Sequence, residues 1–222
     1  MLANTRPNTD GLSPTRSASR EQVVVRNVVG GVIGAALWIS FAVVHVMVFR
    51  ASGRVVGVGL AATELITAIL FLARRQPTAS TGRVRDWATG LAGSFGSLLA
   101  RPGGLHSATG DVVGLSLQAI GLAVVVLGLL ALGRSFGIVA ANRGVVTSGP
   151  YRVVRHPLYV AYVVEQVGYL VQSVRWWNVG VFAVVWACQV ARIRAEERVL
   201  SGDPEYERYR LTTRYRLVPG VW

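Results

Sequence analysis

The chain has 222 residues, of which 52% are hydrophobic and 15% are charged, against roughly 25% charged in an ordinary soluble domain. This composition argues against a plain soluble protein. The 23 basic residues are all arginine and give a net charge of +12, but they lie between long apolar runs, as they do at the ends of membrane spans. We therefore expect no nucleic-acid partner. One cysteine and three widely separated histidines also argue against a metal site.

The predicted elements begin after a polar stretch. The first 27 residues are rich in Ser, Thr, Pro, Asn and Arg and lack the apolar core of a secretory signal, which predicts a disordered tail. Apolar runs able to form membrane helices then follow at 27–49, 55–73, 111–132, 157–173 and 176–191. A further apolar segment, 87–100, reaches only about 21 Å as a helix, which is short for a bilayer. The pattern predicts an all-α integral membrane protein with five to six spans.

The positions of the arginines decide between five and six crossings. If 87–100 crosses, the tail, the connections at 74–85 and 134–155 and the C-terminus share one side, and the other side holds only Arg50, Arg54, Arg101 and Arg175. Because cytoplasmic loops carry an excess of Lys and Arg, this favours six crossings with both termini in the cytoplasm. Five spans with a half-embedded segment is the alternative. The use of arginine alone suggests a GC-rich, bacterial genome, and hence the bacterial inner membrane.

Three glycines within 111–132 share one helix face. Gly114, Gly121 and Gly128 recur every seven residues, so they form a stripe against which a neighbouring helix can pack closely. We expect a packing role for this stripe.

The longest polar connection, 133–156, leads directly into the span that begins at Pro157, a residue suited to the first position of a helix. The next two spans have similar lengths, so the chain returns to the same membrane face near residue 192. This places Arg155, His156 and Tyr159 close to the acidic and basic residues at 192–197. One interpretation is a solvated, salt-bridged exit helix; the other is a functional site.

The same half of the chain resembles a known enzyme family. The segments VVTSGPYRVVRHPLYVAY at 145–162, RIRAEERVL at 192–200, EYERY at 205–209 and RLVPG at 216–220 together resemble the isoprenylcysteine carboxyl methyltransferase family. The related phospholipid methyltransferases share the RHPxY motif and the paired glutamates. The resemblance covers roughly residues 111–222, and Ala161 stands where the family commonly has glycine. It divides the chain into a tail (1–27), N-terminal membrane helices (28–110) and a methyltransferase core (111–222).

The resemblance implies an integral-membrane methyltransferase that uses S-adenosylmethionine, held by a cytoplasmic loop and a C-terminal helical hairpin. The expected reaction is carboxyl O-methylation of a lipophilic, isoprenyl or lipid-like acceptor. Arg192 and Glu196 are the expected catalytic residues, and Arg192 also faces the substrate. The expected cofactor contacts are Arg143, Gly144, Val145, Val146, Tyr151, His156, Pro157, Leu158, Tyr159, Glu196 and Glu197. Phospholipid N-methylation and a nicotinamide-dependent membrane reductase are alternatives, and a transporter ranks last.

Two acids lie inside predicted spans, where a charge is costly unless it is paired, protonated or turned to a cavity. Glu64 is in the second span and Glu165 in the fifth. Glu165 lies nearly two turns deeper than Tyr159 and is a candidate for lining a substrate cavity. A buried acid bonded to His45, Gln118 or Gln189 is the simpler expectation.

Overall fold

The computed structural model describes residues 14–52, 56–101, 105, 107–172 and 174–222. Nearly all regular structure in this part of the chain is helical. The helices are α1 (Pro14–Ser52), α2 (Val56–Ala73), α3 (Val84–Phe95), α4 (Ala108–Leu132), α5 (Pro157–Gln172), α6 (Trp176–Leu200) and α7 (Pro204–Thr212), with short 3₁₀ turns η1 (Gly96–Leu99), η2 (Gly133–Ser135) and η3 (Gly149–Arg152). Two short strands, β1 (Ala79–Ser80) and β2 (Ala141–Asn142), pair antiparallel.

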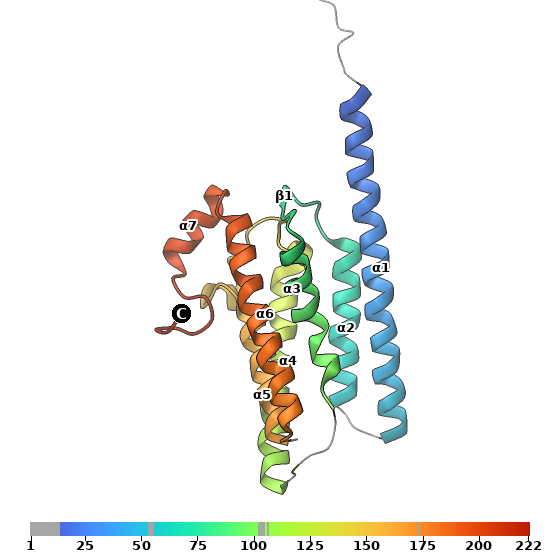
Figure 1. Cartoon of the computed structure of the whole chain (residues 1–222), viewed down its shortest axis with the longest axis vertical. Helices are drawn as coiled ribbons and strands as arrows, with labels where there is room; N and C mark the ends of the chain where they lie inside the picture. Colours follow the sequence, from blue (N-terminus) through green and yellow to red (C-terminus); the bar gives the residue numbers. More distant parts are fainter. Residues whose placement is uncertain (1–13, 53–55, 102–104, 106, 173) are drawn as a thin grey trace, which may run out of the picture.

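Helices α1 to α6 run alongside one another, and successive helices reverse direction (Figure 1). The α2–α3 connection, the α4–α5 connection and the end of α6 therefore meet at one end of the bundle. At the opposite end, the Leu105 N–H donates to the Val174 carbonyl at 3.3 Å, so the chain leaves η1 close to the α5–α6 turn. The basic connections at 74–85 and 134–155 thus lie at the same end of the bundle, as expected from the arginine positions.

Three helical segments are long and apolar enough to cross a membrane: Val28–Ala51, Ala108–Ser135 and Trp176–Leu200. The prediction of a helical, membrane-embedded protein is confirmed at this level. Helix α2 and helix α5 are shorter, and α3 with η1 spans about 26 Å. The number of crossings therefore stays a prediction.

The start of α1 differs from the prediction of a disordered tail. Residues 1–13 lie outside the described part of the chain, but residues 14–27 form the first turns of α1. A helix already nucleated by an apolar span extends at one hydrogen bond per added residue. The polar composition at 14–27 is therefore compatible with helix.

The glycine stripe of α4 packs against α5, as predicted. Gly114, Gly121 and Gly128 are buried. A Cβ at Gly121 would lie 3.0 Å from the Ala161 carbonyl oxygen, and one at Gly128 would lie 2.6 Å from Leu158 Cδ2. The stripe thus sets how closely α5 approaches, and α5 carries the first residues of the candidate site.

The apolar surface is distributed as expected for a membrane protein. A buried cluster joins α1, α2, α4 and α5 around Phe71, Leu129 and Leu158. Many large apolar side chains nevertheless face outward, including Ile33 and Met47 on α1 and Leu130 on α4. Exposed apolar area of this extent is unfavourable in water and suits a lipid environment.

Candidate active site

The connection between α4 and α5 is fixed by Asn142. Its Nδ2 donates to Asp203 Oδ2 at 2.7 Å, and its Oδ1 accepts from the Gly144 N–H at 2.9 Å. Gly144 has a φ of +99°, a conformation that side chains disfavour. These contacts, with the β1–β2 pairing, hold the connection against the start of α7.

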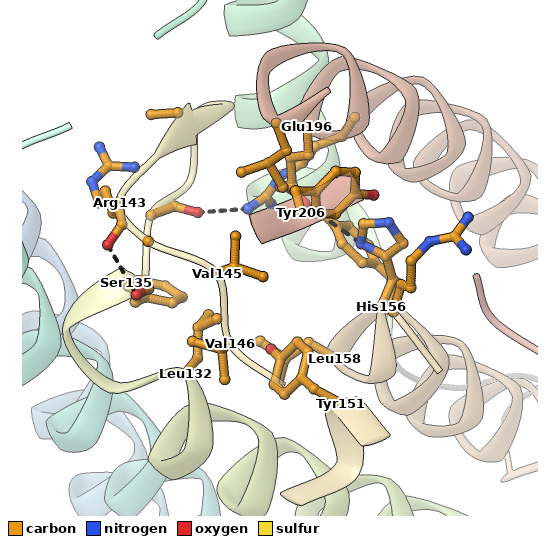
Figure 2. A pocket seen from close by; sticks show the side chains of 18 of the residues that line it. Leu132, Ser135, Arg143, Val145, Val146, Tyr151, His156, Leu158, Glu196 and Tyr206 are labelled. Atoms are coloured by element: carbon orange, nitrogen blue, oxygen red, sulfur yellow. Dashed lines mark hydrogen bonds and ion pairs between the residues drawn. The ribbon is translucent and has the colours of Figure 1, made fainter. Parts of the chain in front are cut away.

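A cavity, partly open to solvent, lies between this connection and helices α5, α6 and α7. Figure 2 shows Val145 and Val146 on the connection, facing Leu158, His156, Glu196 and Tyr206. Ten of the predicted site residues line it: Arg143, Gly144, Val145, Val146, Tyr151, His156, Leu158, Tyr159, Arg192 and Glu196. The structure therefore brings together residues that lie more than 50 positions apart in the sequence.

Glu196 lies at the centre of the polar contacts. Its Oε1 accepts hydrogen bonds from the Tyr159 hydroxyl at 2.5 Å and from Arg192 Nε at 3.1 Å. Its Oε2 lies 3.7 Å from His156 Nδ1. One carboxylate oxygen is thus held by two donors, while the other retains capacity to accept.

Arg192 is buried, and its guanidinium joins three elements. Nη1 donates to Ser94 Oγ on α3 at 3.0 Å, and Nη2 donates to the Gly137 carbonyl at 2.8 Å. The guanidinium carbon also lies 5.3 Å from the centre of the Tyr159 ring. With the bond to Glu196, these contacts use three of the five N–H donors, so two remain.

Glu197, adjacent to Glu196, has a different environment. Its carboxylate pairs with Arg155 at 2.9 Å and with Arg216 at 2.7 Å, and it lies 3.3 Å from His156 Nε2. The backbone N–H of Arg155 and that of His156 donate to residues 215 and 216. Glu197 thus ties the C-terminal segment to the start of α5.

Two predicted cofactor contacts are therefore placed outside the cavity lining. The carboxylate of Glu197 is occupied by the ion pairs above. Pro157 is the buried first residue of α5, where it starts the helix as expected. Both residues belong to the sequence motif, and both support residues that line the cavity without lining it themselves.

Tyrosines that the sequence analysis did not single out also line the cavity: Tyr162, Tyr206 and Tyr209. The Tyr209 hydroxyl donates to the Tyr151 carbonyl at 2.6 Å, and burial raises the pKa of Tyr209 to about 12. Tyr206 and Tyr209 are three residues apart, hence on one face of α7. That spacing within EYERY was the available signal.

Arg143 contributes a positive charge to the cavity. Its Nε is buried and has no hydrogen-bond partner among the described residues. Burial, with the nearby charge of Arg74, lowers the pKa of Arg143 to about 10, so the side chain is still a cation at neutral pH. A buried cation with an unpaired donor suits an anionic ligand group.

A second, larger cavity, also partly open, lies within the helical bundle. Its lining is mainly apolar and comes from α1 to α6, including Trp38, Leu122 and Phe182. Tyr162 lines both cavities. Ser94, which binds Arg192, also lines the second one.

Glu165 lines this second cavity, and its role toward a substrate stays a prediction, but among the described residues the expected hydrogen bond to His45, Gln118 or Gln189 is absent. His45 instead pairs with Glu64 at 2.9 Å, and Gln118 donates to Gln172 at 2.6 Å. Glu165 has no hydrogen-bond partner within the described ranges. The reason is that its side chain lies against Gly121, on the face of α5 turned to α4.

Comparison with known proteins agrees with the motif pattern. The model of the "Isoprenylcysteine carboxyl methyltransferase (ICMT) family" matches residues 113–202, so the resemblance is confirmed over that range. No curated protein and no solved structure matches significantly. Neither the phospholipid N-methyltransferase nor the nicotinamide-dependent reductase gains support from these comparisons.

Proposed function

Because residues 113–202 carry the ICMT family region, we propose that this membrane protein is an S-adenosylmethionine-dependent methyltransferase that methylates the carboxylate of a lipophilic acceptor. One observation carries the proposal. A cavity lined by motif residues, which include the charged side chains of Arg143, Arg192 and Glu196, adjoins a larger, mainly apolar cavity inside the bundle, and the two share Tyr162. A reaction between a polar methyl donor and a lipophilic acceptor requires two adjoining sites of this kind.

The chemistry of the first cavity fits the cofactor. S-adenosylmethionine carries a carboxylate, an ammonium group, ribose hydroxyls and an aromatic base. Arg143, with its unpaired buried Nε, suits the carboxylate, and Glu196 Oε2 suits the ammonium group. The cluster of Tyr151, Tyr206 and Tyr209 offers ring faces for the base.

When bound, S-adenosylmethionine supplies a methyl group on a sulfonium: a carboxylate oxygen forms the new bond to carbon, the electron pair of the broken carbon–sulfur bond stays on sulfur, and no proton moves. The chain's own contribution is then positioning. Arg192 lies where the two cavities adjoin, and its two remaining N–H donors orient the acceptor carboxylate. Tyr159 and Glu196 fix the guanidinium for this task, and a well-oriented pair of reactants needs little further catalysis.

The acceptor occupies the second cavity. Its volume and apolar lining suit an alkyl or isoprenyl chain, whose burial is favourable by roughly 25 cal/mol per Å². The reacting carboxylate then lies at Tyr162 and Arg192, next to the cofactor. With both ligands bound, the tyrosine rings around this point would exclude water, which strengthens the pairing of opposite charges.

The proposal predicts that cofactor binding depends on Glu196. In Glu196→Gln, removal of a charge-assisted hydrogen bond, worth about 1.5–3 kcal/mol, weakens binding of S-adenosylmethionine by roughly 10- to 150-fold. His156→Ala weakens it as well, because the ring lines the same wall. Titration calorimetry on the detergent-purified protein measures both affinities.

Glu207→Gln is the matched control. Glu207, on α7, has a side chain 40% exposed, and its one ion pair within the described part of the chain is with Arg210, at 3.0 Å, so its removal leaves the affinity unchanged. Equal affinities for the wild type, Glu196→Gln and His156→Ala would overturn the site assignment. Incubation with labelled S-adenosylmethionine and a lipophilic acid, with detection of a base-labile methyl ester, tests the reaction itself.

A further inference from the structure

Two side chains in the second cavity have hydrogen-bonding capacity that the protein does not satisfy. Gln189 is 2% exposed, and its Oε1 has no partner. Glu165 also lacks a hydrogen-bond partner among the described residues. Both line the same cavity. An unpaired polar atom buried in an apolar surrounding is costly, which applies to Gln189 Oε1, and the half-buried Glu165 lines the same space, so both are available to a group that enters the cavity.

Several other polar side chains of this cavity are already paired, although Trp38 Nε1 is also buried without a partner among the described residues. Gln166 accepts from Trp186 Nε1 at 2.6 Å and donates to Ser97 Oγ at 3.0 Å. Gln118 and His45 have the partners described above. Among the carboxyl and amide side chains of this cavity, the unpaired acceptors are therefore Glu165 on α5 and Gln189 on α6, whereas Trp38 Nε1 can only donate.

The two residues lie at a similar depth. Glu165 is three residues beyond Tyr162 on α5, and Gln189 is three residues before Arg192 on α6. Because α5 runs into the bundle and α6 returns, each lies three residues deeper than the junction of the two cavities, a rise of about 4.5 Å and nearly one helical turn. Residues three apart also share a helix face, which agrees with their positions in the lining.

We propose that Glu165 and Gln189 select an acceptor that carries a hydrogen-bond donor, a hydroxyl or an amino group, about one helical turn from the methylated carboxylate. This inference rests on the proposed function and narrows its substrate class from lipophilic acids in general to acids with a nearby O–H or N–H. The carboxylate oxygens of Glu165 accept, which sets the direction of the hydrogen bond, and Gln189 Oε1 offers a further acceptor.

The test compares three acids of equal chain length: palmitic acid, β-hydroxypalmitic acid and β-aminopalmitic acid. The readout is the ratio of kcat/KM for each substituted acid to that for palmitic acid, which does not depend on the amount of folded enzyme. We expect a ratio of ~10 for at least one substituted acid, since one buried hydrogen bond is worth about 1.4 kcal/mol in a polar-to-charged pair. The two substituted acids distinguish a hydroxyl from an amine.

Variants of Glu165 and Gln189 test whether these two residues cause the preference for the substituted acids. In Glu165→Leu and Gln189→Met, the ratio falls toward one, whereas Glu165→Gln, which keeps an acceptor oxygen, retains part of it. Gln118→Leu is the control, because Gln118 lines the same cavity but is already bonded to Gln172. A wild-type ratio near one, or a ratio that survives both Glu165→Leu and Gln189→Met, would sink the inference.

A second measurement separates this inference from the proposed function. Each acid is added to the purified protein and the rise in melting temperature is recorded, since a ligand stabilises in proportion to its affinity. If the β-substituted acids stabilise the wild type more than palmitic acid does but none is methylated, the donor selection stands and the methyl transfer fails. If palmitic acid is methylated and all three acids bind equally, the methyl transfer stands and the donor selection fails.

Discussion

Glu196 and Glu197 are adjacent on α6, yet their carboxylates lie on different sides of the helix. Successive residues of an α-helix are rotated by about 100°, so Glu196 faces the cavity and Glu197 faces Arg155 and the C-terminal segment. Side-chain exposure is only 5% for Arg155 and 12% for Glu197. Removing one partner of such a buried ion pair strongly destabilises the fold, because the remaining charge has no water to solvate it.

This gives a prediction at the residue scale. Glu197→Gln leaves Arg155 without its carboxylate and lowers the free energy of unfolding by about 3–5 kcal/mol. Glu207→Gln removes a pair with exposures of 51% and 40% and costs under about 1 kcal/mol. Thermal unfolding in detergent compares the two variants, and an equal loss in both would contradict a structural role for the Glu197 cluster.

At the scale of elements, the packing of α4 on α5 sets the shape of both cavities. The buried glycines of α4 admit α5 so closely that backbone atoms of the two helices are near contact. Helix association in a membrane relies on such close packing, since lipid supplies little hydrophobic driving force. A small displacement of α5 would shift Tyr159, Tyr162 and Glu165 together.

Gly121→Ala tests this packing. The added Cβ meets Glu165 Cγ at 2.5 Å and the Ala161 carbonyl at 3.0 Å, so overpacking lowers the free energy of unfolding by about 1–3 kcal/mol. Gly180→Ala, on an exposed face of α6 with no neighbour within 4 Å, is the matched control and is neutral or slightly stabilising. Circular dichroism melts measure both; a Gly121→Ala protein as stable as Gly180→Ala would show that α5 is free to retreat.

At the scale of the whole molecule, the helix path fixes which connections share an end. The hydrogen bond from Leu105 to Val174 places the segment after η1 beside the α5–α6 turn. The α2–α3 connection lies at the other end, with β1 (Figure 1). If α5 and α6 cross the membrane, then α3 with η1 runs between the same two membrane faces, because its ends lie beside theirs.

Labelling with a membrane-impermeant maleimide tests that path. The background is Cys188→Ser, which removes the only cysteine, and single cysteines are introduced by Arg85→Cys, Leu105→Cys and Arg175→Cys. In sealed vesicles of known orientation, we expect Leu105→Cys and Arg175→Cys to react from one side and Arg85→Cys from the other. Reaction of Leu105→Cys and Arg85→Cys from the same side would establish a half-embedded segment.

Much of the fold was predictable because hydropathy and the positions of the arginines indicate where membrane helices begin and end. The predicted spans agree with α2 and α5 to within a residue or two, and α5 begins at Pro157 as expected. The end of α6 was missed by nine residues, since the charges from Arg192 onward resemble an exit from the membrane. In the fold they are paired, with Arg198 reaching Asp86 at 3.1 Å, and the helix continues to Leu200.

The candidate site was predictable in its location more than in its details. Span lengths alone bring Tyr159 near Glu196, and the structure places a hydrogen bond between them. Which of two adjacent glutamates faces the cavity depends on the rotation of α6, which no pattern of hydropathy records. Tyr206 enters the cavity only because α7 folds back after Asp203, whose side chain caps that helix by accepting from the Glu205 N–H.

The two cavities draw on different parts of the chain. Every residue lining the first lies between positions 132 and 209, whereas the second also takes residues from α1, α2 and α3. Under the proposed function, changes in the first two helices would alter which acceptor fits while leaving the lining of the first cavity intact, whereas α3 affects both cavities because Ser94 accepts a hydrogen bond from Arg192. Such a division allows the chemical step to stay the same while the range of acceptors changes. Exchange of the N-terminal helices between homologous enzymes is therefore a direct route to new acceptors.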